Sequence, residues 1–194
     1  ELRLAKYSNH TDFLNTICEV VKIFKANDVA LTNKLREIEL HYVDLFVPKS
    51  SSLQDMFSVI TLPNSQFYSD GNDRLRVGAI QFTRVLPSGR EKVAVNLEQL
   101  KNIAQNQRKY VPDVLIEPDG KLAMPLNVDR FFSDFSGEEY AIVHTNCAAL
   151  MSEQEADMDR VRLKFEELYQ ESRKTFDAMI QLDVCNDVWI PVTG

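Results

Sequence analysis

The chain has 194 residues, 44% of them hydrophobic and 26% charged, and its formal net charge is −7. This length and composition are typical of a globular chain with its own core and exclude disorder of the whole chain. The negative charge disfavours non-specific binding of nucleic acids and anionic lipids, so we expect neither as a partner. The apolar runs are shorter than the roughly 20 residues of a membrane-spanning helix, so we also expect no membrane insertion.

The first third of the chain alternates extended and helical patterns. A short strand is expected at 2–8, and apolar residues at helical spacing after Thr11, the expected N-cap, predict a helix over 12–26. Alternating apolar and polar residues over 35–48 predict a half-solvated strand that stops at its final proline. A short helix over 53–60, preceded by three serines, is expected next.

The middle of the chain contains the clearest hairpin signal. Two alternating segments, 74–86 and 91–97, flank Pro87-Ser88-Gly89-Arg90, and a proline and a glycine in a four-residue connection are typical of a tight turn. A helix over 97–109 is expected to follow.

The segment 113–126 carries a second, shorter hairpin signal around Pro118-Asp119-Gly120. An apolar centre predicts a strand over 139–147. Helical spacing of large apolar residues then predicts one long amphipathic helix over 153–182, with Ser152 and Glu155 as its capping box.

These elements predict an α+β fold with one or more antiparallel sheets, helices packed on one face and a long C-terminal amphipathic helix. We expect a single domain over 1–194, or two small lobes, one from 1–62 with 74–110 and the other from 111–194. The chain begins at Glu1 without an initiator methionine or a signal-peptide pattern, which predicts a fragment of a longer protein.

The three cysteines, Cys18, Cys147 and Cys185, are odd in number and far apart. Neither a disulfide framework nor paired CxxC units can be built from them. The cysteine usage therefore predicts a reducing compartment, the cytoplasm.

The sequence predicts no catalytic, metal or cofactor site. The histidines lie in different elements, and strand alternation directs His144 and Cys147 to opposite faces, as it does His41 and Asp44. The six glycines form no phosphate-binding loop, and no GxSxG nucleophile motif occurs.

Aromatic residues form the one conspicuous cluster of the sequence: Phe131, Phe132 and Phe135, joined by Tyr140. They either pack an irregular segment under the sheet or form an exposed apolar patch for a partner or ligand. Trp189 either holds the C-terminal tail on the body or anchors an interface.

Two segments carry a family resemblance. The strand over 39–45 (ELHYVDL) resembles the "LRYINRI"-like strand of a sporadically distributed family of uncharacterised bacterial proteins, and 163–180 resembles the closing helix of that family. The helix matches at Leu168, Phe176 and Ile180. Tyr169 stands where the family has a histidine, Asp44 stands where it has an asparagine, and the N-terminal strands of the family have no counterpart here. The resemblance implies a bacterial origin in mobile or accessory gene sets and implies no activity.

Three functions remain open. The first is a non-catalytic interaction or binding module, with a protein or a second copy of the chain as its partner. The second is a small-molecule binding domain with the aromatic cluster lining its pocket. The third is an enzyme whose site assembles from His41, Asp44 and His144.

Overall fold

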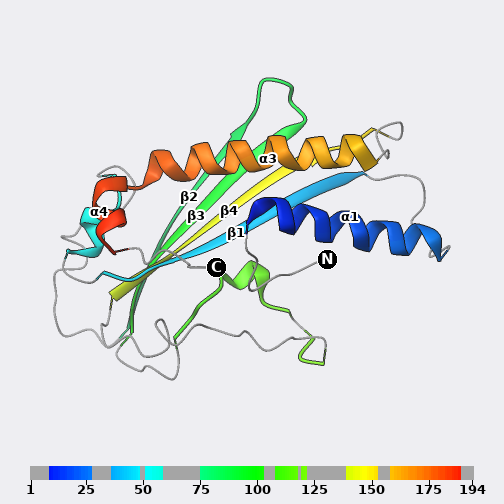
Figure 1. The fold of residues 1–194 in the computed structure, drawn as a ribbon. Helices are drawn as coiled ribbons and strands as arrows, with labels where there is room; N and C mark the ends of the chain where they lie inside the picture. Colours follow the sequence, from blue (N-terminus) through cyan, green and yellow to red (C-terminus); the bar gives the residue numbers. More distant parts are fainter. Residues whose placement is uncertain are drawn as a thin grey trace.

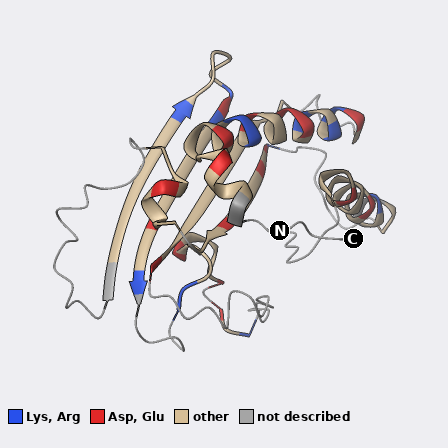
Figure 2. Ribbon diagram, turned by 60° about the vertical axis from the view of Figure 1, so that its left-hand side comes forward, with Lys and Arg blue, Asp and Glu red and all other residues tan. Residues whose placement is uncertain are grey.

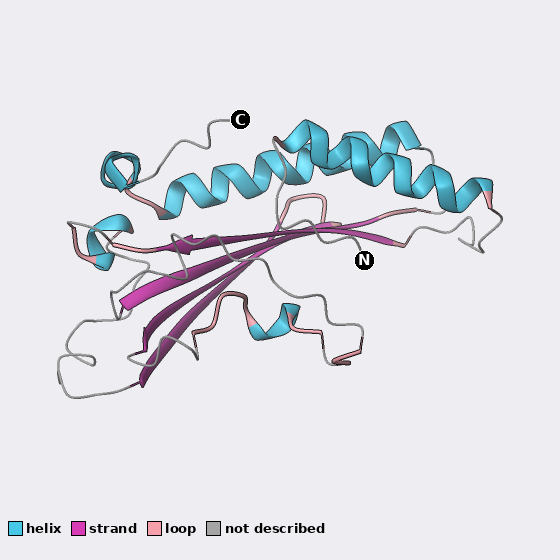
Figure 3. Cartoon of the chain, turned by 60° about the horizontal axis from the view of Figure 1, so that its bottom comes forward, coloured by secondary structure: helices cyan, strands magenta, loops and turns pink. Residues whose placement is uncertain are grey.

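The computed structural model describes residues 9–27, 36–48, 51–58, 75–102, 108–117, 119–121, 139–152 and 158–188. They form a four-stranded antiparallel sheet with the long helices on one face, which confirms the predicted α+β class (Figure 1, Figure 3). The elements are α1 (His10–Ala26), β1 (Glu37–Phe46), the 3-10 helix η1 (Leu53–Met56), β2 (Leu75–Val85), β3 (Glu91–Asn102), the 3-10 helix η4 (Asp113–Leu115), β4 (Glu139–Leu150), α3 (Met158–Met179) and α4 (Leu182–Val188).

The strand order is β1-β4-β3-β2, and every neighbouring pair is antiparallel. The β2–β3 hairpin follows the prediction: the N–H of Leu86 donates to the carbonyl of Glu91 at 2.9 Å, and Gly89 takes a positive φ of 71° in the turn. That left-handed conformation favours glycine because glycine has no Cβ. β4, the last strand in the sequence, lies between β1 and β3, so segments of both predicted lobes form one sheet.

Each face of the sheet has its own layer. The helix face, which carries Leu40, Leu97 and Cys147, is covered by α3 and contains the main core. The stripe that α3 buries consists of Val161, Leu168, Ser172, Phe176 and Met179. The opposite face carries His41, Asn96 and His144 and is called the polar face below; η4 lies on this side (Figure 3). Within the described residues no helix is both long enough and apolar enough to cross a bilayer.

The helices predicted over 12–26 and 53–60 both need correction at one end. α1 begins at His10 because Asn9, rather than Thr11, is the cap: its Oδ1 accepts the backbone N–H of Asp12 at 2.9 Å. The predicted helix over 53–60 is a single 3-10 turn capped by Ser52. It ends early because Phe57 leaves the helix and forms a β-bridge with Ile180.

The predicted helix over 97–109 is wrong for its first six residues, which continue β3 to Asn102. Leu97 and Leu100 are both buried, and a spacing of three suits a helix face. In the sheet they lie on opposite faces, since β3 is an inner strand with a core on each side. Residues 103–107 lie outside the described residues. The expected second hairpin is also wrong at its start, because 113–115 form η4.

The long C-terminal helix is confirmed as α3, but it is shorter than 153–182. It ends at Met179 because the chain there pairs with the segment after η1: Ser58 N–H donates to Met179 O at 2.9 Å, and Gln181 N–H donates to Met56 O at 2.8 Å. A separate short helix, α4, follows. The predicted strand at 2–8 and residues 153–157, with the Glu155 half of the capping box, lie outside the described residues.

Candidate functional site on the polar face

Two histidines from strands far apart in the sequence meet on the polar face. His41 of β1 stands opposite Asn146 of β4, which makes His144 its diagonal neighbour on the same face. Nδ1 of His41 and Nε2 of His144 are 3.0 Å apart, and the two ring planes are within 10° of each other. The ring centroids lie 5.2 Å apart, farther than the facing nitrogens, so the rings meet edge to edge rather than face to face.

A carboxylate extends this pair into a chain of three groups. Nε2 of His41 is 2.9 Å from Oε2 of Glu39, a part-exposed residue on the same face of β1. The chain Glu39–His41–His144 therefore runs from the surface to a buried imidazole. Such a chain can hold an imidazole in one orientation and can pass a proton along its hydrogen bonds.

Burial sets the protonation state of the inner histidine. Loss of solvent, and next the neighbouring His41, lower the pKa of His144 to about 4. His144 is therefore neutral at neutral pH, so one of its ring nitrogens keeps a lone pair. This state suits a hydrogen-bond acceptor, whereas the low pKa makes His144 a weak base at neutral pH.

A second polar group lies beside the histidines. Glu98 of β3 is buried, and its carboxylate accepts hydrogen bonds from Asn96 Nδ2 at 3.1 Å and from Lys109 Nζ at 2.7 Å. Lys109 also pairs with Asp113 at 2.9 Å. Burial opposes the charge of Lys109, but these two carboxylates outweigh burial and raise its pKa. Oδ1 of Asn146 is buried and has no hydrogen-bond partner among the described residues.

The Glu98–Lys109 pair gives a testable prediction. Lys109→Ala is expected to lower the free energy of unfolding by about 1.5 kcal/mol, because the buried carboxylate loses its cation. Urea denaturation measures this loss. Lys92→Ala, which removes an exposed lysine from the same face of β3, is the control and should change stability by less than about 0.5 kcal/mol. The double variant Lys109→Ala/Glu98→Gln should recover part of the loss, and no recovery would contradict the charge argument.

The structure brings together two of the three residues that the sequence suggested as an enzyme site. Asp44 lies on the helix face, opposite Val143, and is thus separated from His41 and His144 by the sheet. Burial raises the pKa of Asp44 to about 6, partly opposed by Arg173 of α3.

The predicted separation of His144 from the nearby cysteine is confirmed, since Cys147 is buried in the core of the helix face. Burial raises the pKa of the Cys147 thiol to about 11. A thiol in this state is a poor nucleophile at neutral pH. All three cysteines are free.

Tyr140 is the one described member of the aromatic cluster. It is buried on the polar face with Leu100 and Ile142, and its hydroxyl accepts the backbone N–H of Lys109 at 3.1 Å. Tyr140 therefore packs the segment that carries η4 onto the sheet and is not part of an exposed patch. Phe131, Phe132, Phe135 and Trp189 lie outside the described residues.

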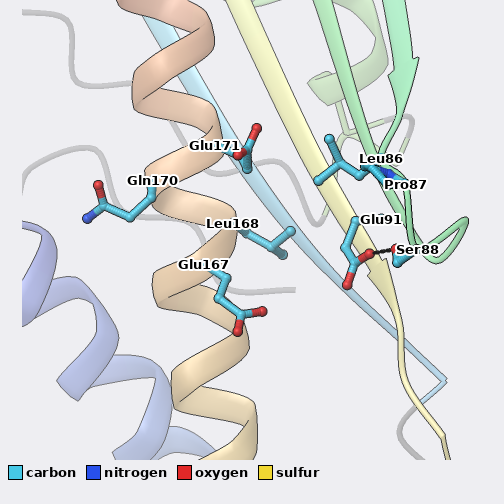
Figure 4. A pocket seen from close by; sticks show the side chains of 8 residues that line it. All are labelled: Leu86, Pro87, Ser88, Glu91, Glu167, Leu168, Gln170 and Glu171. Carbon is cyan, nitrogen blue, oxygen red and sulfur yellow. Dashed lines mark hydrogen bonds between the residues drawn. The ribbon is translucent and has the colours of Figure 1, made fainter.

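A shallow hollow of about 440 Å³ lies between the β2–β3 turn and α3 (Figure 4). It is lined by Leu86, Pro87, Ser88, Glu91, Glu167, Leu168, Gln170 and Glu171. Its three carboxylates already have partners: Lys164 contacts Glu91 and Glu167, and Arg84 contacts Glu171. Each carboxylate of the hollow therefore has a cationic partner within the chain.

In the described part of the chain, no group of three or more histidine, cysteine or acidic side chains is arranged to hold an ion. Sequence reasoning grouped His41 with His144 only as one of three open alternatives, and it missed Glu39. Alternation assigns each residue to a face of its own strand, but it does not reveal that β1 and β4 are neighbours.

Comparison of the chain with protein-family models, with curated proteins and with solved structures finds no match. The resemblance to the bacterial family stays a prediction.

Proposed function

We propose that this chain is a non-catalytic interaction module that binds a protein partner as an added strand along β2. The observation that carries the proposal is the chemistry of the β2 edge: its outward backbone groups are unpaired among the described residues, and its side chains are almost all uncharged. Strand addition to such an edge is a common mode of peptide recognition.

The direction of the backbone groups follows from the hairpin. Leu86 and Glu91 form a hydrogen-bonded pair, and antiparallel ladders alternate such pairs with pairs whose backbone groups point away. The register therefore directs the N–H and C=O groups of Val77, Ala79, Gln81, Thr83 and Val85 away from β3. These groups form a row of donors and acceptors that a partner strand can use.

The side chains of β2 support an uncharged partner. Val77, Phe82 and Val85 are 56%, 43% and 61% exposed, although all three are apolar. Over 77–85 the one charged residue is Arg84, which pairs with Glu171 at 2.7 Å. Figure 2 shows β2 as the outer strand whose described residues are uncharged up to its end.

The other edge of the sheet provides a contrast. β1 carries Glu37 and Glu39 on its exposed positions, and charged residues on an edge strand oppose pairing with another chain. Among the described residues, one edge of the sheet is therefore protected by charge and the β2 edge is not.

Photo-crosslinking in cells tests the proposal. A photoreactive amino acid in place of Val77 is expected to form a covalent adduct with a protein partner, identified by mass spectrometry. Thr83→Pro should reduce the adduct about tenfold, equivalent to about 1.4 kcal/mol of binding free energy. The proline removes an outward N–H and leaves the β2–β3 hydrogen bonds intact.

The control places the same probe at Leu163, which is 62% exposed on α3. This probe should give no adduct that depends on Thr83. Equal adducts from both positions, or an adduct at position 77 that Thr83→Pro leaves unchanged, would overturn the proposal.

A second candidate function is acid–base chemistry on the polar face. The chain Glu39–His41–His144 favours it, because a row of hydrogen-bonded groups can relay a proton between the surface and a buried imidazole. Two variants distinguish the two functions. Thr83→Pro should remove partner binding and leave any turnover unchanged, whereas His144→Asn should remove turnover and leave partner binding unchanged.

A further inference from the structure

We infer that the partner strand on β2 is the same strand of a second copy of this chain, paired antiparallel about Ile80. This inference rests on the proposed function and names its partner. β2 runs from Leu75 to Val85, so Ile80 is its midpoint. Pairing about this residue engages the full strand of both copies, with Leu75 of one copy opposite Val85 of the other.

The sequence of β2 is self-complementary in this register. Phe82, part-exposed on the helix face, stands opposite Gly78 of the second copy, which has no side chain. An aromatic side chain that covers a cross-strand glycine stabilises a sheet edge. On the polar face Val77 stands opposite Thr83, and both are uncharged and exposed.

Strand pairs whose centre is shifted by one residue match their side chains less well. A centre at Ala79 places Phe82 opposite the charged Arg76, and a centre at Gln81 places Gly78 opposite Arg84. Each shift also leaves residues at both strand ends without a partner. The register about Ile80 therefore combines the longest pairing with the best side-chain match.

The charges at the strand ends are compatible with this pairing. Arg84 stands opposite Arg76 of the second copy, and like charges in opposed positions destabilise a strand pair. Arg84, however, is already neutralised by Glu171 of its own chain. The centre of the interface contains no charge, so the net charge of −7 on each copy opposes association only at long range, and salt screens that repulsion.

The described elements place no strand beyond β2. α3 packs mainly on β4 and β1 and contacts β2 through the ion pair of Arg84 with Glu171, and the segment with η4 is held at Tyr140 of β4. A twofold axis perpendicular to the sheet keeps the helices of both copies on one side. The two four-stranded sheets would join into one continuous eight-stranded sheet.

Cysteine substitution tests the register. Ile80 directs its backbone groups to β3, so in the dimer it forms a non-hydrogen-bonded pair with its own copy, at a Cα separation of about 4.5 Å. A disulfide spans this separation. Ile80→Cys should therefore form a disulfide-linked dimer under mild oxidation, at least about tenfold faster than Ala79→Cys, whose copies stand out of register. The native cysteines are buried, so the unmodified chain should form none.

The oligomeric state provides the second measurement. Analytical ultracentrifugation of the unmodified 22.3 kDa chain should show a dimer that persists at high salt, and Thr83→Pro should convert it to a monomer. A monomeric chain, together with a position-77 adduct that contains a different protein, would overturn the second-copy inference and leave the proposed function standing. Absence of both dimer and adduct would overturn both. A faster disulfide at Ala79→Cys than at Ile80→Cys would overturn the register.

Discussion

Replacing Leu168 by alanine is expected to lower the free energy of unfolding by about 3 kcal/mol, within the range for large-to-small substitutions in a core. Leu168 is 1% exposed and lies in the middle of the stripe that α3 packs on the sheet. Truncation removes apolar contacts and leaves a cavity that a helix pinned at its end by the η1 segment cannot readily close. Urea denaturation followed by circular dichroism measures the loss, with the m-value as a check on two-state unfolding.

The control for this substitution lies one and a half turns earlier on the same helix. Leu163 is 62% exposed, so Leu163→Ala removes the same atoms without opening a cavity. Its stability should stay within about 0.5 kcal/mol of the unmodified chain. Equal losses in the two variants would show that helix propensity, rather than packing on the sheet, determines the effect.

Asp44→Asn is expected to stabilise the chain by about 2 kcal/mol near pH 7.5 and to have little effect near pH 4. Burial raises the folded-state pKa of Asp44 from 3.8 to about 6, against a smaller opposing effect of Arg173. This shift corresponds to about 3 kcal/mol, which we reduce because the side chain keeps some contact with solvent.

Proton binding by Asp44 determines how its contribution to stability changes with pH. Between pH 3.8 and about 6 the folded chain holds the Asp44 proton more tightly than the unfolded chain, so the contribution of this group to stability falls as pH rises. The difference in unfolding free energy between Asp44→Asn and the unmodified chain should therefore grow across that window and then level off.

The control for the pH profile is Asp119→Asn, which removes an exposed carboxylate from a turn. The difference in unfolding free energy between Asp119→Asn and the unmodified chain should not grow in the way expected for Asp44→Asn between pH 3.8 and about 6. A constant difference for Asp44→Asn from pH 4 to 8, or a loss of stability at pH 7.5, would contradict the assigned burial effect.

Local patterns were enough to predict much of the fold. The alternation in β1, the turn at Gly89 and the apolar stripe of α3 each reflect contacts within one element and its immediate surroundings. The end of β3 was wrongly predicted as part of a helix over 97–109, whereas Leu97 and Leu100 are buried on opposite faces of the sheet. An inner strand with a core on both sides loses the simple alternation that identifies an edge strand.

The candidate site could be predicted less well from the sequence than the fold could. Alternation correctly separated Asp44 from His41, but the meeting of His41 with His144 depends on the pairing of strands 103 residues apart. The edge position of β2 could not be predicted either. The sequence shows that this strand has few charged residues, but it does not show that the strand lies at the edge of the sheet. Register and strand order are properties of the assembled sheet and cannot be derived from one segment at a time.

The central position of β4 also constrains the order of folding during synthesis. β1 and the β2–β3 hairpin emerge from the ribosome before β4, yet each needs β4 as its neighbour. The hairpin can close alone, whereas β1 must remain without a strand partner until residue 150 has been translated. Contacts between distant segments slow folding, so the nascent chain exposes apolar β1 residues until β4 has emerged and is an expected client of chaperones that bind extended segments.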